Sequence, residues 1–407
     1  MHAQAQKVRS FRQLTPGSLD ASRPIVTLFS GGLDSSYLLL RLRDAGFRNV
    51  HALSVDLGED ETTEDKQFIA KKLGVDLHII DGRQTFAREF VGPAIASQAV
   101  YLDTHPVSST LSRPLIARYA TELAGELGAR TILHTANRSQ NTLRRLNGAL
   151  TLLGFSGQFG SPYELDPVDR SRKIAELGRE GITHMSERVV SCDSNLWCRE
   201  FESGTLDDPE NHAVPEDMYL WTKRDAEREA EIVDITFRRG VLVEVNGVSH
   251  SLVSLIDELN LRVGAHGIGR YSGLEHLDNG EKVLELREMP AAHLLLRTFR
   301  HLESATLQAE TIREKMRVEQ IWVREALEGR WFGELRTAAQ AFVDACSLRV
   351  SGTVRWRLHE GSAETRAIRV QDPLYLRNRE EWESGLISLD SSYYDYAPTR
   401  AGVTRSA

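Results

Sequence analysis

A short loop of glycines, hydroxyl side chains and one carboxylate separates two apolar segments near the start of the chain. It reads Ser-Gly-Gly-Leu-Asp-Ser-Ser over residues 30–36 and follows the apolar run at 25–29. Glycines permit a tight turn in which backbone N–H groups face an anion. The positive end of the dipole of a following helix faces the same anion. Asp34 would repel a phosphate, so we expect it to meet Mg²⁺ or to cap the helix. The pattern predicts a phosphate-binding loop.

The loop is not of the Walker type, because G-x-x-x-x-G-K-[ST] is absent and no lysine follows the glycines. A P-loop kinase or GTPase is therefore disfavoured. A bare Ser-Gly-Gly would more often be a plain strand–helix turn with a helix cap. The full pattern, placed after the first strand of an α/β sheet, favours phosphate binding instead.

Strand and helix signals alternate through the first half of the chain, which predicts a doubly wound parallel sheet of the α/β class. The strands are expected as short runs of β-branched and apolar residues, and the helices as longer amphipathic segments. We expect strands at 25–29, 50–55, 77–80 and 131–134, and helices at 37–46, 64–73 and 114–127, the last with Pro114 at its start.

The second half changes character and predicts an α+β domain. The strand and helix periodicity of the hydrophobic residues fails over 191–215, and a loop-rich junction lies at 207–211. Antiparallel strands are expected over 231–248 with turns at Arg239-Gly240 and Asn246-Gly247, followed by a helical stretch and one more strand. The resulting organisation is a flexible leader at 1–24, an α/β domain at 25–190, an α+β domain at 191–372 and a C-terminal tail at 373–407.

Composition excludes several classes of protein. The 407 residues contain 58 acidic and 50 basic side chains, a net charge of −8, which argues against nucleic-acid binding by bulk charge. The sequence has no apolar run near the roughly 20 residues that span a bilayer. Residues 1–24 are polar and have no apolar h-region, so we expect no secretory signal there. Three cysteines without a C-x-x-C pair predict neither a disulfide framework nor a zinc site. We expect a cytoplasmic protein.

The loop at 30–36 resembles the pyrophosphate loop of the N-type ATP pyrophosphatases, which cleave ATP between the α and β phosphates. That resemblance implies ATP and Mg²⁺ as cofactors and adenylation as the chemistry. The tRNA-modifying members would require catalytic cysteines or a basic RNA-binding domain. The amidotransferase members would require a glutaminase domain with a nucleophilic cysteine, and Met1-His2 supplies none.

From about residue 25 to about residue 375 the chain resembles argininosuccinate synthase. The matching segments come in the family's order: SGGLDSS at 30–36, LSRPLIA at 111–117, NLW at 195–197, PEDMYLWT at 215–222, HGIGR at 266–270, WF at 331–332 and SGTVR at 351–355. The resemblance implies two steps. The ureido oxygen of citrulline attacks the α-phosphate of ATP, and the amine of aspartate then displaces AMP. It also implies small amino-acid substrates and a homotetramer whose C-terminal segments reach neighbouring subunits.

The resemblance assigns an ATP site and two catalytic side chains. Asp34 and Arg113 are implied in catalysis, with Arg113 contacting ATP or substrate. A cation at the start of a helix is unfavourable in the field of the helix dipole unless an anion binds to it. The implied ATP-site residues are Leu28, Phe29, Ser30, Gly31, Gly32, Leu33, Asp34, Ser35, Ser36, Val55 and Thr135.

The implied aspartate site departs from the family's pattern. Asn141 and Arg145 are kept within residues 134–147, but Asn137 replaces a threonine and Thr142 replaces a carboxylate. Arg138 is gained, and its guanidinium fork suits a carboxylate or phosphate.

The implied citrulline site is altered as well, although Ser191 and Glu275 are kept. The replacements are His105 for a tyrosine, Thr110 for a serine, Glu200 for a serine and Arg287 for a tyrosine. Buried together, a glutamate and an arginine would cost several kcal/mol unless they pair with each other or with the substrate. The alternative is that both lie solvated at the rim.

An intact loop beside altered pockets favours a working ATP-dependent ligase whose substrates differ from citrulline, aspartate or both. One alternative is an ordinary argininosuccinate synthase with compensating pocket residues. A second is a scaffold that binds ATP without turning it over.

Overall fold

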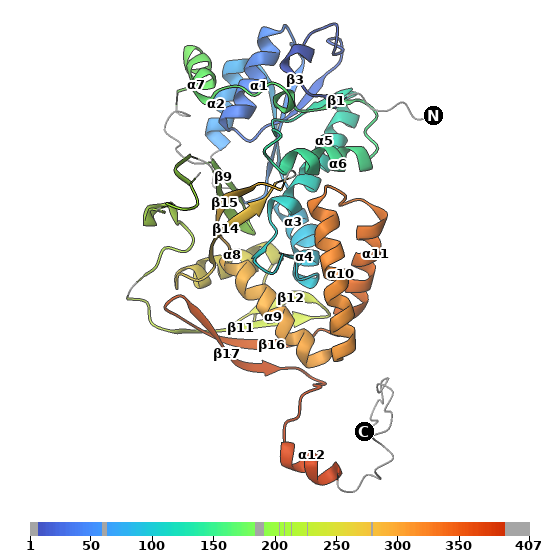
Figure 1. Cartoon of the computed structure of the whole chain (residues 1–407), viewed down its shortest axis with the longest axis vertical. Helices are drawn as coiled ribbons and strands as arrows, with labels where there is room; N and C mark the ends of the chain where they lie inside the picture. Colours follow the sequence, from blue (N-terminus) through green and yellow to red (C-terminus); the bar gives the residue numbers. More distant parts are fainter. Residues whose placement is uncertain are drawn as a thin grey trace.

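The first half of the chain forms a six-stranded parallel sheet in the computed structural model (Figure 1). The structure describes residues 7–58, 63–183, 191–202, 204–206, 208–212, 214–225, 227–277 and 280–386. The strand order is β1-β8-β7-β2-β3-β4, and every neighbouring pair is parallel. The strands are β1 (Lys7–Val8), β2 (Ile25–Leu28), β3 (Val50–Asp56), β4 (Asp76–Asp81), β7 (Thr131–Leu133) and β8 (Gln158–Gly160). The predicted doubly wound α/β fold is confirmed.

Five helices flank this sheet: α1 (Leu33–Asp44), α2 (Thr63–Leu73), α5 (Ser109–Leu127), α6 (Thr142–Leu152) and α7 (Arg170–Arg179). The short helices α3 (Arg83–Phe86) and α4 (Gly92–Ala96) lie farther down and pack against α8 (Leu252–Gly264) and α9 (Pro290–Thr306) (Figure 1). The chain leaves β2 toward β3 on one side and later returns to β7 on the other. The carboxyl ends of β2 and β7 are therefore the switch point of the sheet, the place where open α/β sheets bind ligands.

Two expectations about this half are wrong. Residues 7–24 are not a flexible leader, because β1 pairs with β8 and the side chains of Leu14 and Leu19 are buried. Helix α5 begins at Ser109, so Pro114 lies inside it and not at its start. The proline lacks the N–H that would bond the carbonyl one turn earlier, yet its fixed φ is compatible with the helix.

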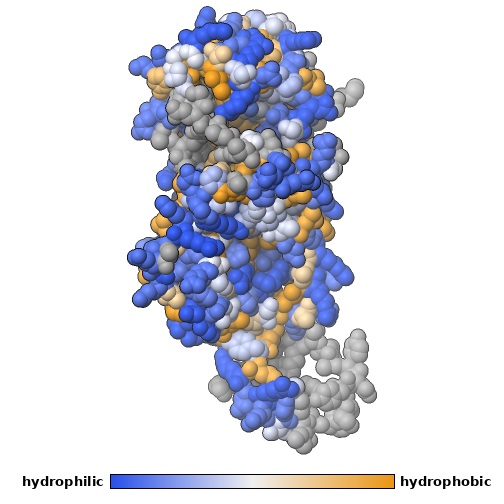
Figure 2. Space-filling model, turned by 60° about the vertical axis from the view of Figure 1, so that its left-hand side comes forward, coloured by the Kyte–Doolittle hydropathy of each residue, from blue (hydrophilic) through white to orange (hydrophobic). Residues whose placement is uncertain are grey.

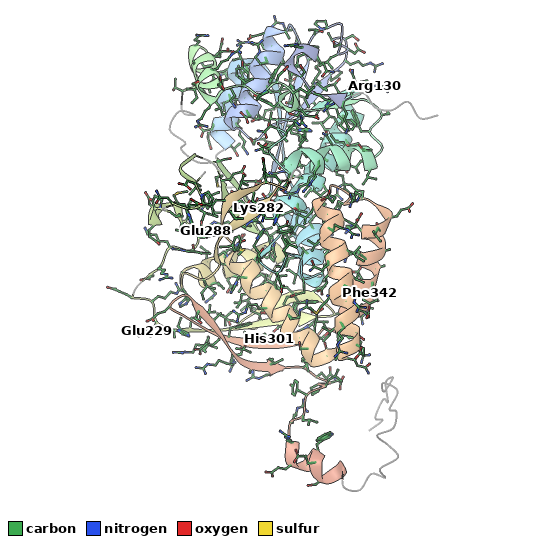
Figure 3. All side chains as sticks on the ribbon, in the orientation of Figure 1. Arg130, Glu229, Lys282, Glu288, His301 and Phe342 are labelled. Carbon is green, nitrogen blue, oxygen red and sulfur yellow. The ribbon has the colours of Figure 1, made fainter. Side chains whose placement is uncertain are left out.

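A four-stranded antiparallel sheet lies beneath the parallel sheet, in the order β14-β15-β10-β9. Its strands are β9 (Ser191–Asn195), β10 (Cys198–Glu202), β14 (Arg270–His276) and β15 (Lys282–Glu288). The loss of strand and helix periodicity over 191–215 therefore does not mean that this segment lacks strands, because β9 and β10 lie within residues 191–202. These strands carry charged side chains inward, so they lack the apolar alternation that marks an ordinary half-buried strand. Figure 3 places Lys282 and Glu288, the two ends of β15, in this middle layer.

The third layer is a five-stranded antiparallel sheet, β13-β12-β11-β16-β17, packed beside helices (Figure 1). Both predicted hairpin turns are confirmed, because Arg239, Gly240, Asn246 and Gly247 all have positive φ, as a two-residue type I′ turn requires. The elements are β11 (Glu231–Arg238), β12 (Val241–Val245), β13 (Val248–Ser249), β16 (Gly352–His359), β17 (Ser362–Arg369), α8 (Leu252–Gly264), α9 (Pro290–Thr306), α10 (Ala309–Leu327) and α11 (Glu334–Ser347).

After this sheet the chain extends away from the body to helix α12 (Arg379–Leu386). Figure 2 shows that segment standing clear, with hydrophobic side chains where it leaves the globular part. Leu374, Leu376 and Trp382 are each about half exposed. The expected tail is thus helical in part, and residues 387–407 lie outside the described residues. Among the described helices, none has the length and apolar character of a membrane span.

Candidate functional site

The loop at residues 30–36 lies at the carboxyl end of β2 and leads directly into α1. Gly31 has φ +82°, a left-handed conformation that glycine adopts without strain. Gly32 is the N-cap of α1 and its N–H is bonded to Ser30 Oγ at 3.2 Å. Ser36 Oγ donates to the Gly32 carbonyl at 2.8 Å, as Ser35 Oγ does at 3.1 Å. These bonds hold the first turn of α1 open as an anion-binding end.

Asp34 does not cap the helix, because no side chain caps α1 and Asp34 lies two residues beyond its N-cap. Its carboxylate pairs with the ammonium of Lys173 on α7, and its carbonyl accepts a hydrogen bond from the Tyr163 hydroxyl at 2.9 Å. Lys173 is 9% exposed. The loop thus gains a lysine from a distant helix in place of the one that a Walker loop carries in sequence. No spacing in the sequence signals this contact.

The other implied ATP-site residues fall into two groups, those whose side chains belong to the hydrophobic core and those that lie at strand ends. The side chains of Phe29 and Val55 are buried in the hydrophobic core, and Leu33 packs against it, so mainly their backbones are available to a ligand. Leu28 ends β2, and Thr135 follows β7 at the neighbouring strand end. The prediction brings these residues to one edge of the sheet, but it does not separate core side chains from ligand-facing ones.

Arg113 lies on α5, and a carboxylate pairs with its positive charge. Its guanidinium pairs with Asp193 of β9 and also bonds Ser112 Oγ at 3.0 Å and Thr142 Oγ1 at 3.4 Å. This group joins the parallel sheet domain to the four-stranded sheet. Asp193 was not among the predicted residues, because the segment that carries it reads as a loop.

A cavity of about 240 Å³ lies where α5, α6, β14 and β15 meet. Six of the predicted substrate residues line it: His105, Thr110, Asn141, Arg145, Glu275 and Arg287. Asn141 Nδ2 donates to the His276 carbonyl at 2.9 Å, and Arg145 bonds Ser109 Oγ at 2.8 Å and Glu275 at 3.4 Å. The structure therefore assembles one acceptor pocket from segments about 180 residues apart in sequence.

The remaining predicted substrate residues lie outside this lining. Asn137 accepts the Ser139 N–H at 2.9 Å within its own turn, and Arg138 and Ser191 are exposed. Thr142 contacts Arg113. These four positions, together with Glu200 on β10, do not line the cavity.

Glu200 and Arg287 are buried partners, at 5% and 2% exposed, so the alternative that both lie solvated at the rim is wrong. They face each other across β10 and β15, and Arg287 Nη1 lies 2.7 Å from Glu200 Oε1. Arg287 Nη2 lies 2.5 Å from Glu285, and Nη1 also donates to the Pro106 carbonyl at 3.0 Å. Burial raises the pKa of Glu200 and of Glu285, partly offset by the charge of Arg287. Every nitrogen of Arg287 is thus engaged by the protein.

His105 presents a defined face to the cavity. Thr104 Oγ1 donates to the Tyr101 carbonyl at 2.6 Å, so its single proton is used and His105 Nδ1 must be the donor in the 2.9 Å bond between them. The imidazole is then neutral with a lone pair on Nε2. Burial, aided by the charges of Arg287 and Arg145, lowers the pKa of His105 to about 3.

His134 is fixed in a neutral form at the end of β7. Its Nδ1 accepts the Ala136 N–H at 3.3 Å, so its Nε2 donates to Asn147 Oδ1 at 3.1 Å. Burial lowers the pKa of His134 to about 4. The ring holds the start of the loop that leads to Asn141.

We expect the protein to lose stability as the pH falls from 6.5 toward 4. An unfolded histidine titrates near 6.5, whereas His134 stays neutral down to about 4, so protons favour the unfolded chain in that window. The contribution is on the order of 3 kcal/mol at most. His134→Gln should flatten the pH dependence of the urea midpoint between 6.5 and 4. His212→Gln, at an exposed position, serves as the control. An unchanged slope in His134→Gln would contradict the assignment.

Both halves of the chain match models of one protein family. The family model "Arginosuccinate synthase N-terminal HUP domain" matches residues 24–153, and "Arginosuccinate synthase C-terminal domain" matches residues 190–388. The chain is 35% identical over 337 residues to argininosuccinate synthase of Dictyoglomus thermophilum, covering 82% of this chain and 84% of that protein. It is 34% identical over 377 residues to that of Methanocaldococcus jannaschii, covering 92% and 93%. With both family domains matched and its relatives covered nearly end to end, the chain belongs to the argininosuccinate synthase family.

Proposed function

We propose that the protein is an ATP-dependent C–N ligase whose substrates differ from citrulline, aspartate or both. It would adenylate a ureido or carbonyl oxygen with release of pyrophosphate, and an amino-acid amine would then displace AMP. One observation carries the proposal: the phosphate loop is complete, while the acceptor cavity beside it is rebuilt around the buried Arg287–Glu200–Glu285 group. Burying such charges is costly unless they pair with each other or with a ligand, so their presence where the family has a serine and a tyrosine supports a changed substrate.

In the first step the acceptor oxygen attacks the α-phosphorus of ATP, and the bond between that phosphorus and the bridging oxygen breaks. The leaving pyrophosphate gathers negative charge at the loop, where the backbone N–H groups near Gly31 and Gly32 and the Lys173 ammonium can receive it. In the second step the amine attacks the activated carbon, loses a proton, and expels AMP. The protein contributes positioning and charge stabilisation in both steps.

Mg²⁺ is the proposed metal, bound together with ATP. The Asp34 carboxylate is the hard oxygen donor that the loop offers, and it is already held by an ammonium that a cation could replace. The ion would neutralise charge on the departing pyrophosphate. Arg113, held at the domain junction by Asp193, is the proposed contact to ATP or to the adenylated intermediate.

We further propose a homotetramer in which the C-terminal segment contacts a neighbouring subunit. The half-exposed side chains of Leu374, Leu376 and Trp382 on a segment that stands clear of the body support this arrangement.

An ordinary argininosuccinate synthase of arginine biosynthesis is the second candidate. Asn141, Arg145 and Glu275 remain in the cavity, and the relatives at about 35% identity carry that name.

An assay of AMP release separates the two candidates. The protein is incubated with Mg²⁺-ATP, citrulline and aspartate, and AMP and pyrophosphate are counted. We expect less than about 1% of the AMP that an active argininosuccinate synthase forms in parallel, a loss equivalent to about 2.7 kcal/mol of transition-state stabilisation. Conversion at ordinary rates would establish the second candidate. Tight ATP binding with no pyrophosphate exchange in the presence of any acceptor would support the third alternative, a scaffold that binds ATP without turning it over.

A further inference from the structure

A second cavity, of about 200 Å³, lies at the amino-terminal edge of the parallel sheet. It is bounded by Val50, the first residue of β3, and by the segments in which α1 and α2 end. The phosphate loop lies at the other end of α1, and the 12 residues of that helix span about 18 Å. Figure 1 shows α1, α2 and α7 together at the upper end of the molecule. The cavity is therefore separate from the phosphate loop and from the acceptor cavity.

The lining of this second cavity includes four cationic side chains and no carboxylate: Arg43, Arg48, Lys71 and Lys72. Arg43 is already paired, because its guanidinium lies 2.9 Å from Glu180 and 3.3 Å from Asp44. The hydrogen bond from Arg43, with a contribution from the charge of Lys72, lowers the pKa of Glu180. Two carboxylates beside the cavity thus face four cations.

Arg48 and Lys71 are exposed, and neither forms an ion pair within the described part of the chain. A basic side chain in the last turn of a helix offsets the negative end of the helix dipole, and Lys71 occupies such a position in α2. Arg48 lies in the turn between α1 and β3, outside any helix. Each helix end carries only about half a charge, so two helix ends and two carboxylates still leave an excess of positive charge.

Apolar side chains form another part of the lining. Phe47, Val50 and Leu73 border the cavity, and none of them is more than 4% exposed. A bare inorganic ion would leave this apolar surface uncovered. A molecule that joins an anionic group to a small apolar body would cover the apolar surface and also meet the cations, as ligands of concave sites commonly do.

We propose that this second cavity is a binding site for a phosphate monoester of a small apolar molecule. The guanidinium of Arg48 offers the forked donors that bind phosphate oxygens, and the ammonium of Lys71 adds a point charge. Neither cation has to leave a carboxylate partner to bind the ligand. The organic body of the ester covers Phe47 and its apolar neighbours. The inference does not rest on the proposed function, because the two cavities share no residue.

Three probes test the anionic group and the apolar body separately. Phenyl phosphate carries both, phenol carries only the ring, and inorganic phosphate carries only the charge. Binding of each is measured by calorimetry with Mg²⁺ and α,β-methylene-ATP present, so that the phosphate loop is occupied. We expect phenyl phosphate to bind with a Kd below about 1 mM, and the other two probes to bind at least about tenfold more weakly. Phenol or inorganic phosphate binding as tightly as phenyl phosphate, or no saturable binding of phenyl phosphate, would overturn the inference.

Two double variants locate the binding site. Arg48→Gln combined with Lys71→Gln should weaken the binding of phenyl phosphate at least about tenfold, and both side chains are exposed, so the fold should be kept. Lys7→Gln combined with Arg349→Gln removes the same charge from exposed positions on β1 and after α11, and should leave the Kd unchanged. An unchanged Kd in the first double variant, or an equal loss of affinity in both, would contradict the inference. The ligase itself is tested separately, because pyrophosphate exchange does not enter this measurement.

Discussion

Replacing Gly31 by alanine will reduce ATP–pyrophosphate exchange by at least about 100-fold, on the scale seen when a donor to a developing charge is lost. Gly31 has φ +82°, and a Cβ there strains the backbone by about 1 kcal/mol or more. The strain itself is small. The larger effect comes from a change in the direction of the N–H groups at the start of α1, since those groups receive the pyrophosphate.

Gly46→Ala is the control for that strain. Gly46 has φ +90° at the end of α1, and open space surrounds the position of its Cβ, so the substitution carries a similar backbone cost far from the loop. We expect Gly46→Ala to lower the unfolding midpoint slightly and to keep the exchange rate. Equal loss of exchange in both variants would show that stability, not phosphate binding, governs the Gly31→Ala result.

Replacing Arg287 by methionine will destabilise the protein by about 3–5 kcal/mol, because it leaves Glu200 and Glu285 buried without their cation. The two carboxylates can escape part of this cost by binding protons. The loss should therefore be larger at pH 8 than at pH 5. The measurement is the urea midpoint of unfolding at both pH values.

Two further variants separate charge from packing. Adding Glu200→Gln and Glu285→Gln to Arg287→Met removes the unpaired charges, and we expect it to recover most of the lost stability. Arg330→Met breaks a comparable pair with Glu325 at a position where the arginine is 45% exposed, and should cost no more than about 1 kcal/mol. If the triple variant is no more stable than Arg287→Met, the arginine acts through its packing.

Four strands of the parallel sheet, β2, β3, β4 and β7, and the loop at its edge could be predicted from sequence because they follow local rules. Strands β1 and β8, of two and three residues, are too short to carry such a signal. Short apolar strands, amphipathic helices and the glycine turn at residues 30–36 each carry their signal within a few residues. The type I′ turns at Arg239-Gly240 and Asn246-Gly247 were predictable for the same reason. Helix α5 was placed five residues late because proline more often opens a helix than lies within it.

The acceptor site was only partly predictable. The resemblance supplied His105, Asn141, Arg145, Glu275 and Arg287, and all five line one cavity. It could not supply partners that come from distant segments, namely Lys173 for Asp34 and Asp193 for Arg113. Strands β10 and β15 escaped detection because several of their buried side chains are charged, which reverses the pattern by which buried strands are recognised. Strand β9, with the sequence SCDSN, has no apolar alternation at all.

The most direct test of the account is ATP–pyrophosphate exchange measured with Mg²⁺ and a panel of amino acids and amines, with mass spectrometry of the products. The account predicts that exchange depends on an acceptor other than citrulline, and that AMP, never ADP, accompanies the adduct. Citrulline-dependent exchange with argininosuccinate as the product at ordinary rates would contradict it.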